Sequence, residues 1–349
     1  LKRISIDFKL NKNWKYLGIL GAIAGVLILS YYSVFAGIAF SYMFKIFPFG
    51  LDNPSKYSTY YFSSFSDSPL KLIFWHSIFI IFTCVIVGYG VIKGIGRSVS
   101  FLMPIFFVFI ILIAIYSSIT GDLDSTLFFL FNPNFSALTP QVIISAMGQA
   151  FFSLSIGMGA IMAYGAYIPE NQLIGKTVLS IILLDTFVAL IAGIAIFPIV
   201  FSNSELMINA GPSLIFETLP VAFYSLPFGS IFSVLFFVLL SIAALSSSIS
   251  LLEPFTAWME EKLKIERKII VCISGFFIWI LGLGSIFSFN IWAETKFFGF
   301  NFLEGLDYLT NNIMLPLGGF LIALLIGWIL PKHFLKENLK VKNSLFRPF

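Results

Sequence analysis

The chain has 349 residues, of which 58% are hydrophobic and only 11% are charged, and its mean hydropathy is +0.97. Because a soluble globular protein carries about 25% charged residues, this composition excludes an ordinary water-soluble domain and predicts an integral membrane protein in contact with the lipid bilayer. The net charge of +4 gives no indication of a nucleic-acid partner.

Transmembrane helices need about 20 mainly apolar residues, and eight segments of the chain meet that requirement. The expected spans are residues 16–44, 71–92, 98–118, 142–168, 177–201, 231–258, 269–289 and 308–330. An even number of spans places both ends of the chain on the same side of the membrane. No low-complexity tract or soluble domain interrupts the series, so we expect one transmembrane domain over residues 1–349.

Lys and Arg are unevenly distributed between the two sets of loops. One set, together with both ends of the chain, carries 17 of these residues, whereas the opposite set carries Lys45, Lys56, Lys71 and Lys296. By the positive-inside rule the richer side is cytoplasmic, so we expect a plasma (inner) membrane protein with both ends of this chain inside. The basic tail expected at the inner surface consists of Lys332, Lys336, Lys340, Lys342 and Arg347.

The first span contains small residues and a possible ligand-facing pair. Gly21 and Gly25 have the GxxxG spacing that allows helices to pack closely. Ile28 and Tyr32 are four residues apart, so they share a helix face and could offer an apolar wall and a phenolic hydroxyl to a ligand. Core packing is the alternative role for this pair.

The fourth span contains two hydroxyl side chains and two glycines near its middle, at Ser153, Ser155, Gly157 and Gly159. Each glycine weakens a helix by about 1 kcal/mol relative to alanine. An interrupted helix here would free backbone carbonyls and half-helix ends, which transporters direct at ions and at substrate carboxylates. Tight packing of small residues against a neighbouring helix is the alternative.

A carboxylate lies deep in the fifth span. Asp185 is about eight residues, roughly 12 Å, from the start of this span. An intramembrane carboxylate costs on the order of 2.5 to 3.5 kcal/mol, so we expect Asp185 to interact with a cation or to carry a transferable proton. A protonated, hydrogen-bonded structural role is the alternative.

The sixth span carries a set of oxygen atoms on one face. Ala243, Ser246 and Ser247 have the spacing i, i+3 and i+4, which places one backbone carbonyl and two hydroxyls together. Hard cations bind oxygen atoms of this kind, while hydrogen bonding between helices is the alternative. Before this span, a turn at Gly211 and an amphipathic stretch predict an outer helix over about 211–226.

The sequence gives no indication of an enzyme. It contains no HExxH, GxSxG, Walker A or CxxC motif, so we expect neither catalysis nor an organic cofactor. Cys84 and Cys272 lie in apolar runs far apart in the sequence, which predicts two small buried hydrophobic residues and no disulfide framework.

Several of these segments together resemble the neurotransmitter:sodium symporter family. Residues 149–160, QAFFSLSIGMGA, are similar to the signature of the family's sixth helix. The resemblance extends over essentially the whole chain, and the further matching segments are 30–33 (SYYS), 93–97 (KGIGR) with Met103 and Pro104, 211–220, and 243–249 (AALSSSI).

The resemblance implies an all-α membrane protein with the five-plus-five inverted-repeat transporter fold. The eight expected spans would correspond to the family's third to tenth helices, so the first two helices and the region after the tenth helix would be missing from this sequence. In the family, the first helix supplies much of both sodium sites and of the backbone that holds the substrate.

The resemblance also implies roles for individual residues. Ala243, Ser246 and Ser247 match ligands of the second sodium site, whereas Ser153 matches a ligand of the first sodium site that also faces the substrate, with Gln149 as a neighbour of the ion site. Asp307 matches an extracellular gate carboxylate whose arginine partner lies on the family's first helix, and Phe152 matches an aromatic lid. The implied substrate-binding residues are Ile28, Tyr32, Phe152, Ser153, Ser155, Met158, Ser247 and Leu251.

Two positions depart from the family pattern. Asp185 stands where the family commonly has Asn, and Ala189 stands where chloride-dependent members have Ser. We therefore expect Asp185 to join the sodium site and to supply a fixed negative charge in place of chloride.

The expected function is sodium-coupled symport of an amino acid by alternating access, independent of chloride. Ile28, Phe152, Met158 and Leu251 predict a hydrophobic or aromatic substrate, because the flexible Met158 can yield to a large group. The expected partners are the amino acid, sodium ions and the lipid bilayer. A non-transporting amino-acid binding or sensor protein and a proton-coupled transporter are the alternatives.

Overall fold

The computed structural model describes residues 8, 9, 11–45, 52–165, 174–202 and 211–331. Within these residues the protein is helical, and the β-structure consists of one isolated bridge between Phe297 and Phe300. Seven helical stretches of this part are long and apolar enough to cross a membrane. They are α2 (Lys15–Tyr42), α4 (Pro69–Gly88), η2 and α5 (Val91–Gly96 and Arg97–Thr120), α9 (Ile174–Phe201), α11 (Gly229–Leu263), α12 (Arg267–Phe287) and the stretch Phe302–Ile329.

The last of these stretches changes its winding along its length. It consists of α13 (Phe302–Asp307), the wide π-helical turn η5 (Tyr308–Met314), α14 (Leu315–Leu324) and a second π-helical turn, η6 (Leu325–Ile329). Seven of the expected spans each overlap one of the seven stretches, and their boundaries differ by several residues.

The expected span 142–168 has a different form. The structure has two shorter helices, α7 (Pro140–Ser153) and α8 (Ala160–Gly165), and the chain between them is not helical. Ser155, Gly157 and Gly159 adopt φ angles of 55°, 89° and 78°. These left-handed conformations cannot belong to a right-handed helix, and glycine adopts them without steric cost. Residues 166–168 of the expected span lie outside the described residues.

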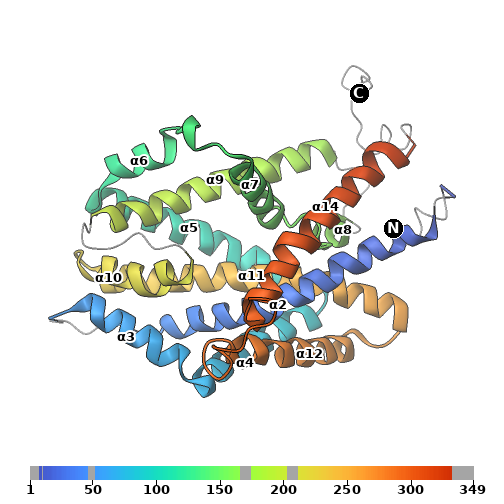
Figure 1. Ribbon diagram of the computed structural model, residues 1–349, viewed down its shortest axis with the longest axis horizontal. Helices are drawn as coiled ribbons and strands as arrows, with labels where there is room; N and C mark the ends of the chain where they lie inside the picture. Colours follow the sequence, from blue (N-terminus) through green and yellow to red (C-terminus); the bar gives the residue numbers. More distant parts are fainter. Residues whose placement is uncertain (1–7, 10, 46–51, 166–173, 203–210, 332–349) are drawn as a thin grey trace.

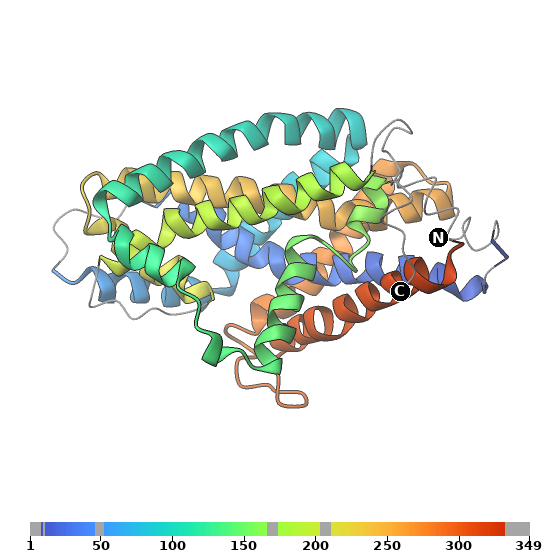
Figure 2. The same ribbon diagram turned by 90° about the horizontal axis from the view of Figure 1, so that it is seen from above.

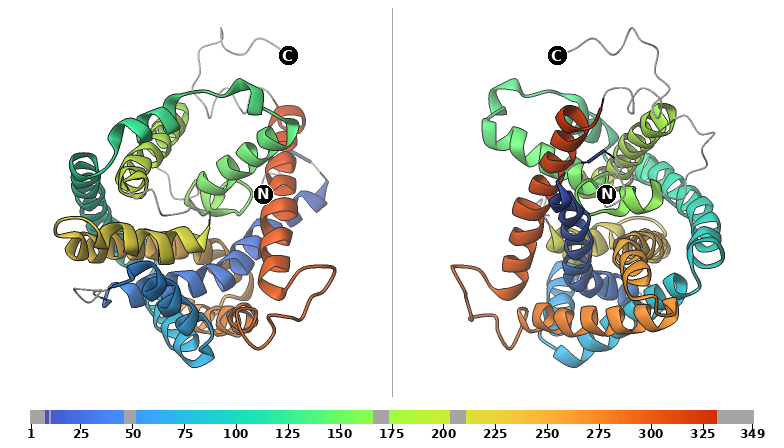
Figure 3. Two further views of the ribbon diagram at one scale, coloured as in Figure 1. Left: turned by 60° about the vertical axis from the view of Figure 1, so that its left-hand side comes forward. Right: turned by 90° about the vertical axis from the view of Figure 1, so that its right-hand side faces the viewer.

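Helix α2 occupies the centre of the helical bundle (Figure 1) and packs mainly against α11, α4 and α12. Helices α5 and α9 lie side by side along much of their length (Figure 2), and α14 packs against α2 (Figure 3). Two large apolar clusters form the interior. One includes Ile28, Met158 and Leu251, and the other includes Tyr42, Phe223 and Phe237.

Helices α3 (Pro54–Ser66), α6 (Leu123–Phe131) and α10 (Leu219–Tyr224) lie at one end of the bundle (Figure 1). The chain also has two short turns, η3 (Phe135–Ala137) and η4 (Leu214–Thr218). Together, η4 and α10 occupy the predicted outer helix 211–226. The Tyr42 hydroxyl donates to the Phe216 carbonyl at 3.1 Å and the Ser58 hydroxyl donates to the Glu217 carbonyl at 2.8 Å, so η4 is fixed to α2 and α3.

Asp122 caps the start of α6. It accepts hydrogen bonds from the Ser125 hydroxyl and backbone N–H at 2.6 and 3.0 Å, and these bonds lower the pKa of the Asp122 carboxyl. A side-chain oxygen at this position satisfies a backbone donor that has no partner within the helix.

The described ends of the chain meet at the opposite end of the bundle. Leu17 of α2 is buried in one cluster with Leu325 and Leu330, and Trp14 of η1 (Lys12–Trp14) packs against that cluster. The basic tail from Lys332 to Arg347 lies outside the described residues.

The expectation of two buried cysteines is wrong for Cys272. Both thiols are free, but Cys84 is half-buried and Cys272 is exposed on α12. An apolar helix in a bilayer has no need to turn every apolar residue inward, because lipid solvates such side chains as well as a protein core does.

Candidate functional site

The interruption between α7 and α8 is held between two other helices. A Cβ atom built on Gly21 of α2 would lie 2.9 Å from the Gly157 oxygen and 2.9 Å from the Gly159 nitrogen, and one built on Gly318 of α14 would lie 3.0 Å from the Gly157 oxygen. At Gly21 only glycine allows the backbones to approach this closely, and a side chain at Gly318 would require the backbone of Gly157 to give way by a few tenths of an ångström. The close packing expected for Gly21 is therefore a contact with the interrupted segment itself.

A hydroxyl and a carboxylate meet at the point where α7 ends. The Ser153 hydroxyl donates to Oδ2 of Asp185 on α9 at 3.1 Å and also lies 3.5 Å from the Ala150 carbonyl. Asp185 is half-buried and Ser153 is exposed. Gln149 is exposed one helical turn before Ser153, on the same face of α7.

A second group of oxygen atoms lies on α11. The Ser246 hydroxyl donates to the Ala243 carbonyl at 2.9 Å, so these two predicted ligands touch each other. Ser247 is exposed, and its hydroxyl lies beside the Tyr32 hydroxyl of α2. Among the described residues, no hydrogen bond joins this group to Ser153 or Asp185.

The predicted apolar substrate residues come together in the structure. Ile28, Met158 and Leu251 are buried in one cluster, and Tyr32 and Phe152 pack against the same cluster. They come from α2, α7, α11 and the interrupted segment, so the cluster adjoins both groups of oxygen atoms. Ser155 is half-buried within the interruption.

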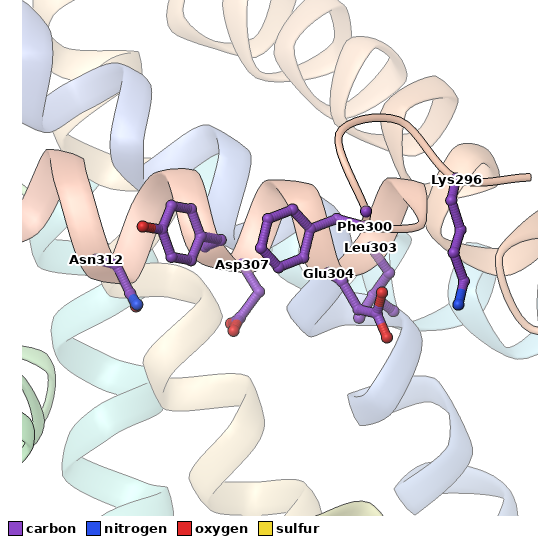
Figure 4. A pocket seen from close by; sticks show the side chains of 8 residues that line it. Lys296, Phe300, Leu303, Glu304, Asp307 and Asn312 are labelled. Carbon is purple, nitrogen blue, oxygen red and sulfur yellow. The ribbon is translucent and has the colours of Figure 1, made fainter.

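A hollow of about 480 Å³ lies near the start of the last helical stretch and is lined by Lys296, Phe300, Glu304, Asp307 and further residues. Figure 4 shows the Glu304 and Asp307 carboxylates on the same side of the helix. Oδ1 of Asp307 accepts a hydrogen bond of 2.7 Å from the Asn311 side chain. The predicted gate residue therefore borders an open space and has a partner on its own helix.

The structure contains two further polar groups outside the predicted site. Arg267, at the start of α12, forms ion pairs with Glu253 and Glu260 of α11 and donates to the Val87 carbonyl of α4 at 2.9 Å. Glu253 is fully buried, and an acidic residue inside a span was the available signal for a partner. The other group surrounds Asn311, where Pro316 gave a signal for irregular winding, because proline lacks the N–H that an α-helix needs.

Three comparisons with known proteins agree. The model of the sodium:neurotransmitter symporter family matches residues 67–348. An uncharacterized sodium-dependent transporter of Haemophilus influenzae is 34% identical over 97% of this chain and 75% of its own length. The sodium-dependent transporter YhdH of Bacillus subtilis, also uncharacterized, is 35% identical over 96% of this chain and 74% of its own length.

The fold comparison gives the same result. A crystal structure of MhsT in complex with L-phenylalanine has 39% sequence identity to this chain and a TM-score of 0.86, covering 96% of this chain and 77% of that one. A match of this extent in both sequence and structure makes this an integral membrane transport protein and not an enzyme. The chain belongs to the sodium:neurotransmitter symporter family.

Proposed function

We propose that this protein takes up a hydrophobic or aromatic amino acid by sodium-coupled symport and alternating access, without a requirement for chloride. The observation that carries this proposal is the interrupted helix between α7 and α8. At this interruption, the Ser153–Asp185 pair and backbone groups without helical partners lie next to the apolar cluster of Ile28, Met158 and Leu251.

The oxygen atoms of the site suit sodium. Hydroxyl, carbonyl and carboxylate oxygens are ligands of hard cations. Ser153 and Asp185 contribute to one ion site, with Gln149 nearby, and Ala243, Ser246 and Ser247 contribute to the other. A sodium ion at the first site offsets the charge of Asp185, whose carboxylate otherwise costs free energy within the membrane.

The apolar cluster selects the substrate side chain. Burial of each methylene group contributes about 0.8 kcal/mol, so a large apolar side chain between Ile28, Met158 and Leu251 binds better than a polar one. Phe152 covers this space as a lid, and the Tyr32 hydroxyl, beside Ser247, binds the substrate carboxylate. The L-phenylalanine bound to MhsT supports this substrate class.

Sodium drives uptake because it binds one conformation better than the other. A ligand shifts a conformational equilibrium only by its difference in affinity for the two states. Sodium bound beside the interruption favours the arrangement in which Ser155 and the neighbouring backbone bind the amino acid. The movement of sodium down its gradient then drives accumulation of the amino acid.

The orientation proposed for this chain places both described ends in the cytoplasm and Asp307 at the outer surface. Its support is the excess of Lys and Arg in one set of loops, together with the packing of Leu17 against Leu325 at one end of the bundle. The single transmembrane domain and the plasma-membrane location belong to the same proposal.

Uptake of radiolabelled L-phenylalanine into proteoliposomes tests the function. We expect accumulation at least about 10-fold greater with an inward sodium gradient than with choline in place of sodium. Ser247→Ala should raise the sodium concentration for half-maximal uptake. The control is Ser241→Ala on the same helix, because the buried Ser241 hydroxyl has no hydrogen-bond partner among the described residues.

Two outcomes would contradict sodium symport. Accumulation in choline that follows a pH gradient would assign coupling to a proton, which a half-buried Asp185 can carry. Binding of the amino acid without accumulation under any gradient would assign the protein to sensing.

A further inference from the structure

A hydrogen-bond network that the proposed function leaves unused connects the outer hollow, through Asp307, to the interior of the bundle. Asp307 lines the hollow, and its Oδ1 accepts from Nδ2 of Asn311 at 2.7 Å. The same Nδ2 lies 3.4 Å from the hydroxyl of Tyr31 on α2. One amide group therefore joins the proposed gate carboxylate to the central helix of the bundle.

The hydroxyls of Thr310 and Tyr31 extend this network. The Thr310 hydroxyl has acceptors in the Leu306 carbonyl at 2.9 Å and the Asp307 carbonyl at 3.2 Å, and it lies 3.3 Å from the Tyr31 hydroxyl, where either group can donate. The Tyr31 oxygen accepts from Asn311. Rotating the Asn311 amide by half a turn would place its oxygen against the Asp307 carboxylate, and two acceptors at that distance repel each other.

The oxygen atom of the Asn311 amide shows that this orientation costs free energy. Oδ1 of Asn311 is buried and has no hydrogen-bond partner among the described residues. Leaving a buried acceptor unpaired costs free energy, so the two contacts made by Nδ2 determine how the amide is oriented.

The backbone around Asn311 is wound to make these contacts. The Leu315 N–H donates to the Thr310 carbonyl, five residues earlier, which defines the wide turn η5. Pro316 follows directly and lacks an N–H, so regular α-helical bonding fails at this point. Such single wide turns occur often at functional sites. Here the turn directs Thr310 and Asn311 together toward Tyr31, which is only 7% exposed.

We propose that Asn311 is a positioning residue of the outer gate, which orients the Asp307 carboxylate and ties it to the turn of α2 that carries Tyr31 and Tyr32. This inference rests on the proposed gating role of Asp307. Asn311 holds one carboxylate oxygen and leaves Oδ2 for a cationic partner across the hollow. Tyr32, the next residue along α2, faces the proposed substrate region, so the same helical turn contacts both the gate and the substrate.

A double-mutant cycle in proteoliposomes containing the complete protein tests this role. Asn311→Leu should raise the KM for L-phenylalanine by about 10-fold and change the maximal rate by less than about 2-fold, because a poorly oriented gate releases substrate before it is transported. Asp307→Asn should raise the KM similarly. If Asn311 acts through Asp307, adding Asn311→Leu to Asp307→Asn should produce no further increase.

A matched control lies on the same wide turn. Leu309 is 41% exposed and forms no part of the network of Asp307, Asn311 and Tyr31, so Leu309→Ala should leave the KM unchanged while perturbing the turn to a similar extent. Fold changes that multiply in the Asn311→Leu/Asp307→Asn double variant would overturn the inference, as would a loss of maximal rate with an unchanged KM.

The results also separate this inference from the gate on which it rests. A higher KM in Asp307→Asn with no change in Asn311→Leu leaves the gate intact and refutes the role of Asn311. An unchanged KM in Asp307→Asn refutes the gate itself and the positioning role with it.

A second variant covers the case in which Asn311→Leu does not fold. Asn311→Asp keeps the shape of the side chain but replaces the donor with an acceptor. Its KM should be high at about pH 7.5 and should fall toward the wild-type value at about pH 5.5, because a protonated carboxyl can donate to Asp307. The ionisable groups nearby are Asp307 and Glu304 on the same helical stretch, Tyr31 on α2, and Lys296 in the preceding loop. A KM without this pH dependence, relative to wild type, would contradict the inference.

Discussion

Asp185 is the residue whose position most constrains the mechanism. It lies well inside α9, where an ionised side chain requires a partner, and its contact among the described residues is the Ser153 hydroxyl at 3.1 Å. A neutral hydroxyl solvates a carboxylate but does not neutralise it. A bound sodium ion would complete this arrangement. The Asp185 carboxylate would then supply the negative charge that balances sodium, in place of a chloride ion.

The anion dependence of uptake tests this role of Asp185. Wild-type uptake should be equal in chloride and gluconate, because the fixed carboxylate already balances the sodium charge. Asp185→Asn should lower uptake by about 10-fold or more, which corresponds to about 1.4 kcal/mol of lost stabilisation. The control for the chemical change is Asp124→Asn on the exposed helix α6. Undiminished uptake by Asp185→Asn in gluconate would show that the charge has no such role.

At the scale of elements, the interruption between α7 and α8 is held by glycine contacts. A methyl group at Gly21 would collide with backbone atoms of Gly157 and Gly159, which cannot move aside as the end of a flexible side chain can. The position of the interruption is therefore set by α2 as much as by the local sequence.

Gly21→Ala should lower both thermal stability and uptake. We expect a loss of about 1–3 kcal/mol, the usual cost of adding a methyl group where no space exists, measured by thermal unfolding in detergent. Gly88→Ala is the matched control, because a Cβ atom at Gly88 meets no heavy atom within 4 Å. That variant should be as stable as wild type or slightly more stable. Equal stability of the two variants would mean that α2 tolerates a shift at this contact.

The ion pair between Glu253 of α11 and Arg267 of α12 predicts unequal losses of stability when one partner or the other is replaced. Arg267→Leu leaves the fully buried Glu253 without a positive partner, which costs about 3–5 kcal/mol. In Glu253→Leu, Arg267 keeps its contact with Glu260 at 3.2 Å and is 13% exposed, so the loss should be smaller.

Thermal unfolding of the two single variants and of the double variant measures this difference. The double variant should be more stable than Arg267→Leu alone, because it removes the buried charge together with its partner. An Arg267→Leu protein as stable as wild type would contradict the interpretation of this pair as a buried ion pair.

The elements differ in how far the sequence predicts them. The continuous spans follow from the length of apolar runs, because the bilayer imposes one requirement on every such helix. The interruption was one of two possibilities for Gly157 and Gly159, since small residues serve both unwinding and close packing. The direction of the Asn311 side chain depends on contacts with Tyr31, which is 280 residues away, and no local pattern encodes such a contact.

At the scale of the whole molecule, the proposed link between sodium and the amino acid runs through shared elements. Helix α2 carries Gly21 against the interruption and Tyr32 beside Ser247, so the interrupted segment, the second oxygen group and the apolar cluster all contact the same helix. Occupation of one site should therefore stabilise the arrangement that the other ligand needs.

Ligand-dependent stability tests this linkage on the complete protein in detergent. Sodium should raise the free energy of unfolding relative to potassium, by about 2.7 kcal/mol at a concentration 100 times the dissociation constant. L-phenylalanine should add a further increase in sodium but little or none in potassium.

Because coupling between two binding sites is reciprocal, the factor by which sodium raises the affinity for the amino acid must equal the factor by which the amino acid raises the affinity for sodium. Calorimetric titrations in both orders measure the two factors. Ser247→Ala should reduce both of them together, while Ser241→Ala should leave both unchanged. An equal stabilisation by L-phenylalanine in sodium and in potassium would show that the amino acid binds without any thermodynamic connection to sodium.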